Sequence, residues 1–160
     1  MKSLGQLIAD YTTQLQQGAL QTAYKGIFDY LGRLRSELAA KYPDYEVGNS
    51  IYQGYMDMSY FSLNTKQLKE KGLKIAIVYI HTKGKFEIWL SARNREILKK
   101  YQTVFRGCQI NGCFHDADNE DAVIEYTLAA EPDFDNQLKL SETICEGTEK
   151  FLSAVVGLVG

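Results

Sequence analysis

Apolar residues recur at helical spacing through residues 1–40. One stripe runs from Leu4 to Leu15, and Gly18 is suited to end that helix in the left-handed conformation. A second stripe runs from Leu20 to Leu38 and must stop before Pro43, because proline pushes the preceding residue out of the α region. The short connection predicts an antiparallel helical hairpin over residues 1–40.

Strand patterns dominate the next segment. Residues 51–63 alternate, 73–81 are almost continuously apolar, and 85–91 alternate again. In the first strand, the two sides are Tyr52, Met56, Met58 and Tyr60 against Gln53, Tyr55, Asp57 and Ser59. A two-residue turn at Lys83 and Gly84 would set Ile80 opposite Glu87 and Val78 opposite Trp89. One face then carries Ile77, Tyr79, Phe86, Ile88 and Leu90, and the other carries Ala76, Val78, Ile80, Glu87 and Trp89.

The rest of the chain adds a helix over 92–105 with Ser91 as its N-cap, a loop over 106–121 and a strand over 122–130. Ser141 is suited to cap a last helix over 141–156. The predicted order is ααβββαβα, with a mainly antiparallel four-stranded sheet in 50–131. We expect one α+β domain over residues 1–160.

Charge is unevenly divided along the chain. Residues 1–110 hold 16 basic and 9 acidic side chains, or +7, whereas 111–160 hold 2 and 11, or −9. Either the two halves pack together, or the basic part faces an anionic partner. Neither half is basic enough to indicate nucleic-acid binding. No apolar run is long enough to span a bilayer, and three cysteines fit reduced thiols, so we expect a cytoplasmic protein.

Catalytic motifs are weak. The element order matches the core of restriction-endonuclease-like folds, in which two carboxylates hold a divalent cation and a third-strand lysine positions water. Asp57 and Glu87 could supply the acids, but Trp89 stands where the lysine should be. Cys108, Cys113 and His115 are too loosely spaced for a typical zinc site. We therefore assign no catalytic residue, no metal ligand and no cofactor.

Arg93 and Arg95 open a helix, although a helix N-terminus favours anions. One interpretation is an anion pocket in which they meet Lys66 or Lys69. A second is an internal ion pair with the acidic segment 116–121, or with Glu87, and a third is plain solvated surface.

The stretches "SIYQGYMDMSYFSL" and "LKIAIVYIHTKGKFEIWLSARNREILKKY" resemble an uncharacterised bacterial family, a domain of unknown function of about this length. The resemblance extends over most of the chain. It implies a small bacterial cytoplasmic domain and supplies no activity and no site residue.

We therefore expect a non-catalytic binding or interaction module with an aromatic and polar sheet face. Its candidate ligand-binding residues are Tyr55, Asp57, Glu87, Trp89, Arg93 and Arg95. The partner would be a small anionic ligand or a protein, with no membrane contact. The alternative is a metal-dependent hydrolase or a degenerate nuclease-like domain that uses Asp57 and Glu87. A third hypothesis is a partner protein that forms a homodimer through the N-terminal hairpin.

Overall fold

The computed structural model describes residues 1–106, 112–114 and 119–159. Its helices are α1 (Leu4–Gln16), α2 (Ala19–Lys41), α3 (Lys66–Glu70), α4 (Arg95–Arg106) and α5 (Gln137–Val159). Its strands are β1 (Glu46–Val47), β2 (Tyr52–Gln53), β3 (Met58–Asn64), β4 (Leu73–Ile80), β5 (Lys85–Ala92), β6 (Cys113–Phe114) and β7 (Ile124–Ala129). The predicted α+β class is confirmed.

The strands form one sheet in the order β1-β3-β4-β5-β7-β6, and β2 pairs with β3 beside β1. Every pairing is antiparallel, as predicted. The predicted strand count of four and the order ααβββαβα are wrong in detail. The additional strands β1, β2 and β6 have two residues each, which is too short for an alternating pattern to reveal them.

The hairpin of β4 and β5 has the predicted faces but a different register. Ile80 pairs with Lys85 and Ala76 with Trp89, so residues 81–84 form the connection and the predicted two-residue turn is wrong. The Gly84 N–H donates to the carbonyl of Ile80 at 2.8 Å, and Gly84 has a φ of 60°. Because side chains alternate with a period of two, a shift of two residues leaves each side chain on its predicted face.

The predicted strand 51–63 is in fact a hairpin. Tyr52 pairs with Tyr60 and Gln53 with Ser59, and the connecting turn contains Met56 at a φ of 64°. The Gly54 N–H donates to the Met58 carbonyl at 2.9 Å, and a Cβ on Gly54 would lie only 2.8 Å from that oxygen. Glycine is therefore required where the chain folds back.

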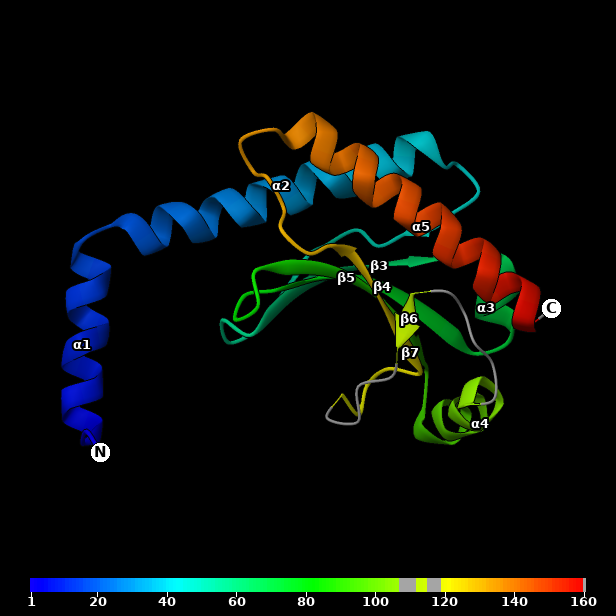
Figure 1. Ribbon diagram of the computed structural model, residues 1–160, viewed down its shortest axis with the longest axis horizontal. Coiled ribbons are helices and arrows are strands. Elements are labelled where there is room, and N and C mark those ends of the chain that lie inside the picture. Colours follow the sequence, from blue (N-terminus) through cyan, green and yellow to red (C-terminus); the bar gives the residue numbers. More distant parts are fainter. Residues whose placement is uncertain (107–111, 115–118, 160) are drawn as a thin grey trace.

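Helices α2 and α5 cover one face of the sheet and enclose the core (Figure 1). From the helices the core takes Tyr30, Leu31, Leu34, Leu38, Ile144, Phe151, Leu152 and Val155. From the sheet it takes Phe61, Leu63, Ile75, Ile77, Phe86, Ile88 and Leu90. A buried hydrogen bond of 3.0 Å joins the Tyr30 hydroxyl to that of Ser141 and ties α2 to α5. Because both long helices lie on this side, the middle of the opposite face has no helical cover (Figure 1).

The predicted N-terminal hairpin does not form as expected. Helix α1 ends at Gln16 and Gly18 follows at a φ of 79°, but α1 projects away from the body instead of packing along α2 (Figure 1). None of its residues is buried. Its apolar stripe stays exposed, with Leu4 at 74% and Ile8 at 53%. The stripe therefore indicates the helix but not what the helix packs against.

Two predicted helix starts are also wrong. Strand β5 continues through Ser91 to Ala92, and Asn94 caps α4 by accepting the Ile97 N–H at 2.9 Å. The Ser91 hydroxyl instead donates to the backbone carbonyl of Asp121. Helix α5 begins at Gln137, so Ser141 lies buried within it.

Candidate functional site

The open face of the sheet, opposite α2 and α5, carries cross-strand rows of side chains. One row pairs Ser62 with Ala76, Ala76 with Trp89 and Trp89 with Glu125. The next pairs Tyr60 with Val78, Val78 with Glu87 and Glu87 with Thr127. Ala76 thus lies beside Trp89 and Val78 beside Tyr60, so these small side chains of β4 separate the two aromatic rings diagonally.

A hollow of about 600 Å³ lies over this part of the sheet. Tyr52 and Tyr60 border it on one side, with their rings stacked 4.8 Å apart, and Trp89 borders it on the other. Tyr60 stands on β3 and Trp89 on β5, which are two strand spacings or about 9.6 Å apart, and the two residues lie in adjacent cross-strand rows. Aromatic rings pack with centroids about 4.5–7 Å apart, so one flat ring above Ala76 could contact both sides.

Buried carboxylates lie at one end of the face, around a smaller hollow of about 240 Å³. Glu87 and Glu125, each 2% exposed, line it together with Asp57. Glu87 accepts the Trp89 indole N–H at 2.9 Å through Oε1, and its Oε2 pairs with the Lys85 ammonium at 2.5 Å. Glu125 accepts a hydrogen bond from the Asn119 amide. The indole contact fixes the orientation of the Trp89 ring.

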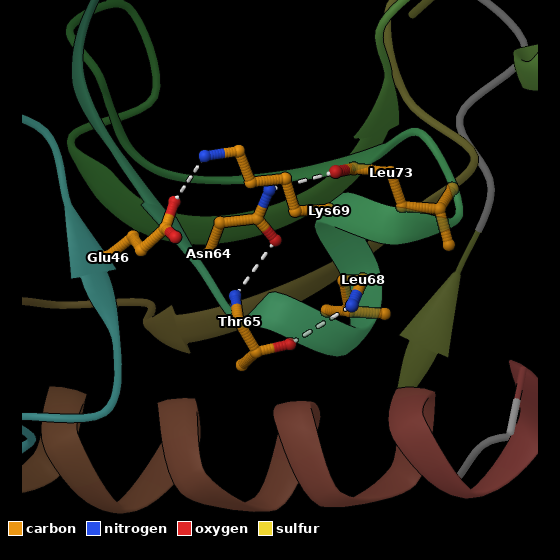
Figure 2. A network of polar contacts seen from close by, with 6 residues as sticks. All are labelled: Glu46, Asn64, Thr65, Leu68, Lys69 and Leu73. Atoms are coloured by element: carbon orange, nitrogen blue, oxygen red, sulfur yellow. Dashed lines mark hydrogen bonds and ion pairs between the residues drawn. The ribbon is translucent and has the colours of Figure 1, made fainter.

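Basic side chains lie at the other end, around a third hollow of about 570 Å³. Lys69, Lys74 and Arg93 line it, with Glu46 as the carboxylate among its lining residues. Figure 2 shows the polar network at this end. Lys69 pairs with Glu46 at 2.9 Å, and the Asn64 amide donates to the Leu73 carbonyl at 2.9 Å.

The three hollows share residues and form one continuous groove, which we call the open-face groove. Met58 and Trp89 line both the acidic and the aromatic hollows. Ser62, Lys74 and Ile75 line both the aromatic and the basic hollows. The groove therefore runs along β4 with carboxylates at the turn end, rings in the middle and cations at the start of the strand.

The structure brings part of the predicted site together. Asp57, Glu87 and Trp89 line the acidic hollow, and Arg93 lines the basic one. Tyr55 is 99% exposed in the β2–β3 turn, and Arg95 is exposed in the first turn of α4; neither lines the open-face groove.

The sequence interpretation missed several groove residues, among them Tyr52, Tyr60 and Lys74. Lys74 and Ala76 interrupt the apolar run of 73–81 at alternate positions, which is a signal for an accessible face. Alternation predicts Tyr52 and Tyr60 on the side of their strand away from Asp57, and no pattern in the sequence links that side to the face of Trp89.

The structure bears on each interpretation of the two arginines. Within residues 1–106, 112–114 and 119–159, neither Arg93 nor Arg95 forms an ion pair. Glu87 pairs with Lys85 instead. Residues 115–118 of the acidic segment lie outside the described residues. Arg93 does share a hollow with Lys69, as the anion-pocket interpretation proposed, while Lys66 lines a different hollow.

Metal and thiol chemistry finds little support in the described chain. No three His, Cys, Asp or Glu side chains in the described residues gather so that they could hold a metal ion. Burial raises the pKa of the Cys113 thiol to about 11, which keeps the thiol protonated. Cys108 and His115 lie outside the described residues.

Comparisons with known proteins identify a family but no activity. Among the described residues, no helix has both the length and the apolar character needed to cross a membrane. No curated protein and no solved structure matches the chain. The model of a family described as a domain of unknown function, DUF7000, matches residues 4–159. Since that match spans most of the chain, the protein belongs to the DUF7000 family of domains of unknown function.

Proposed function

We propose that this protein is a non-catalytic binding module that holds a small ligand in the open-face groove. The observation that carries the proposal is the hollow above Ala76, between the stacked Tyr52 and Tyr60 rings and the Trp89 ring. Binding sites are typically concave and mainly apolar, with a few polar groups that orient the ligand. The groove has this composition, because polar groups lie at its two ends.

Two carboxylates of the groove, Glu87 and Glu125, support binding over catalysis. The two oxygens of Glu87 are engaged by Trp89 and Lys85, and Glu125 accepts from Asn119. Carboxylates held in this way orient neighbouring side chains and are poorly placed to transfer protons. The Ser59 hydroxyl contacts His81 at 2.9 Å, but Ser59 is 2% exposed and cannot meet a substrate in this conformation.

The fluorescent probe 1-anilinonaphthalene-8-sulfonate tests the proposal, because it combines aromatic rings with an anionic group. Trp89 is the single tryptophan of the chain, so energy transfer from its indole reports probe bound nearby. Ala76→Leu should fill the floor of the groove and weaken probe binding at least tenfold. Its matched control is Tyr55→Ala, which removes an exposed ring outside the groove and should leave binding unchanged.

Two results would contradict the proposal. Probe binding that Ala76→Leu does not change would place the probe elsewhere, for example on the exposed stripe of α1. Absence of binding to the wild-type protein would remove the groove as a ligand site. Thermal unfolding of each variant, compared with wild type, separates loss of binding from loss of the fold.

The alternative of a metal-dependent hydrolase rests on Asp57 and Glu87, which line the same hollow. Thermal unfolding with Mg²⁺ and Mn²⁺ tests it. A bound cation would raise the midpoint of unfolding, and Asp57→Asn would abolish the rise. We place this function second, because the described residues hold no cluster of three metal ligands.

A further inference from the structure

We infer that the open-face groove binds a mononucleotide, with its base between Tyr60 and Trp89 and its phosphate at Lys74 and Arg93. The inference rests on the proposed function, since it names the ligand class of the same groove. Four properties of the groove support it: the charge of its basic end, the placement of Arg93, the spacing along β4, and the carboxylates that line its aromatic and acidic parts.

The basic end has cations that the described chain does not neutralise. Three cations, Lys69, Lys74 and Arg93, and one carboxylate, Glu46, line this hollow, for a net charge of +2. Glu46 is already paired with Lys69 at 2.9 Å. Within the described residues, Lys74 and Arg93 have no carboxylate partner. Two such cations, Lys74 on β4 and Arg93 directly after the paired strand β5, suit a group with several anionic oxygens.

The backbone holds Arg93 in place at this end. Its N–H donates to the Gly72 carbonyl at 2.9 Å, and Gly72 has a φ of 75°. A Cβ on Gly72 would lie 3.1 Å from Arg93 Nε and 2.6 Å from Ile97 Cδ1. The Arg93 side chain therefore crosses the bare Gly72 backbone, a path that any larger residue would obstruct. A guanidinium held in this way can present its donors to phosphate oxygens in a fixed orientation.

The spacing along β4 matches a base joined to a phosphate through a sugar. Lys74 and Ala76 are two residues apart on the same face, so their Cα atoms lie about 7 Å apart along the strand. A ring above Ala76 would therefore have its anionic group one short linker away from the Lys74 ammonium. Ser62, the cross-strand partner of Ala76, lines both the aromatic and the basic hollows.

The carboxylates favour a ring that carries amino groups. Asp121, whose backbone carbonyl accepts the Ser91 hydroxyl, lines the aromatic hollow, and Asp57 lines the acidic hollow. These carboxylates can accept hydrogen bonds from an exocyclic amine but would repel an anionic ring. An amino-substituted base with a phosphate complements both ends, whereas inorganic phosphate alone leaves the aromatic and acidic parts unused.

Adenosine monophosphate, adenosine and inorganic phosphate are the probes that test the inference, with quenching of Trp89 fluorescence and calorimetry as readouts. Adenosine monophosphate should bind at least tenfold more tightly than adenosine or phosphate at low salt. Lys74→Gln and Arg93→Gln should each weaken its binding about tenfold, the effect of losing one charge-assisted hydrogen bond. Binding of adenosine should change less than twofold in both variants.

Arg95→Gln is the matched control, because it removes the same charge from an exposed arginine outside the groove. It should leave all three affinities unchanged. Equal effects of Arg93→Gln and Arg95→Gln would mean nonspecific attraction and would overturn the inference. If 4-aminobenzoate bound as tightly as adenosine monophosphate, the ligand would be a carboxylate. If a single-stranded oligonucleotide bound more tightly than adenosine monophosphate, the ligand would be a polymer. Either result would also overturn the inference.

The inference and the proposed function can fail separately. In one outcome, Ala76→Leu weakens binding of the naphthalene probe, but adenosine monophosphate binds no more tightly than adenosine. The groove is then a binding site, and the inference of a phosphate subsite is wrong. If neither probe binds, the proposed function itself is wrong.

Discussion

Replacing Glu87 by leucine should destabilise the protein more than a typical surface change. Its carboxylate is 2% exposed, accepts the Trp89 indole N–H at 2.9 Å and pairs with Lys85 at 2.5 Å. A hydrogen bond to a charged group contributes about 1.5–3 kcal/mol, and removal of one partner of a buried pair costs about 3–5 kcal/mol. Because the Lys85 side chain is 22% exposed and can regain water, we expect a loss of about 2–3 kcal/mol in the free energy of unfolding.

Urea unfolding followed by circular dichroism measures this loss by linear extrapolation. The double variant Lys85→Met with Glu87→Leu is the informative comparison, because replacing both partners by apolar side chains leaves no unpaired charge. It should be more stable than Glu87→Leu alone. A loss below about 0.5 kcal/mol for Glu87→Leu, or a double variant less stable than the single one, would refute the reasoning.

Three further predictions address other parts of the fold. Removal of residues 1–17 should leave the thermal midpoint almost unchanged, because no α1 residue is buried, and any self-association seen by sedimentation at two concentrations should disappear with the exposed stripe. Gly72→Ala should lower the free energy of unfolding by about 1–2 kcal/mol in urea titrations, since alanine is strained at a φ of 75°. Burial lowers the pKa of His81 and outweighs the opposing effect of Asp57, so the unfolded chain binds the proton more readily. Stability should therefore fall as pH drops below about 6.5 toward that lowered pKa, and thermal unfolding across this range should show a weaker pH dependence for His81→Gln.

The sheet shows which structural features can be predicted from the alternation of polar and apolar residues. The faces of β4 and β5 could be predicted although the turn was placed wrongly, because a register error of two residues preserves the side of every side chain. In the same way, Tyr52 and Tyr60 share a face whether residues 51–63 form one strand or a hairpin, since both arrangements preserve their parity. Patterns of period two therefore predict faces more securely than they predict pairings.

The composition of the groove was harder to predict. Helix α3 connects β3 to β4. No pattern in this helix indicates which side of β3 lies on the same face of the sheet as Ala76 and Val78 of β4. Tyr55 and Asp57 were therefore grouped with Trp89 in place of Tyr60, which shares the open face through its pairing with Val78. The position of α1 could not be predicted for a similar reason. An apolar stripe indicates that one side of a helix is apolar, but it does not indicate which element packs against that side.

The fold shows where the unevenly distributed charges of the sequence lie. The cations of the basic end, Lys69, Lys74 and Arg93, come from the basic part of the chain, residues 1–110. Glu125 and Asp121 come from the acidic part: pairing of β7 with β5 brings Glu125 to the same face of the sheet, and Asp121, which precedes β7, lines the aromatic hollow. The two interpretations of the asymmetry are therefore compatible, since the halves pack together and also leave cations along one end of a groove. A ligand with a single charge could bind such a groove in one orientation only, so the polarity of the face would determine which end of the ligand meets Arg93.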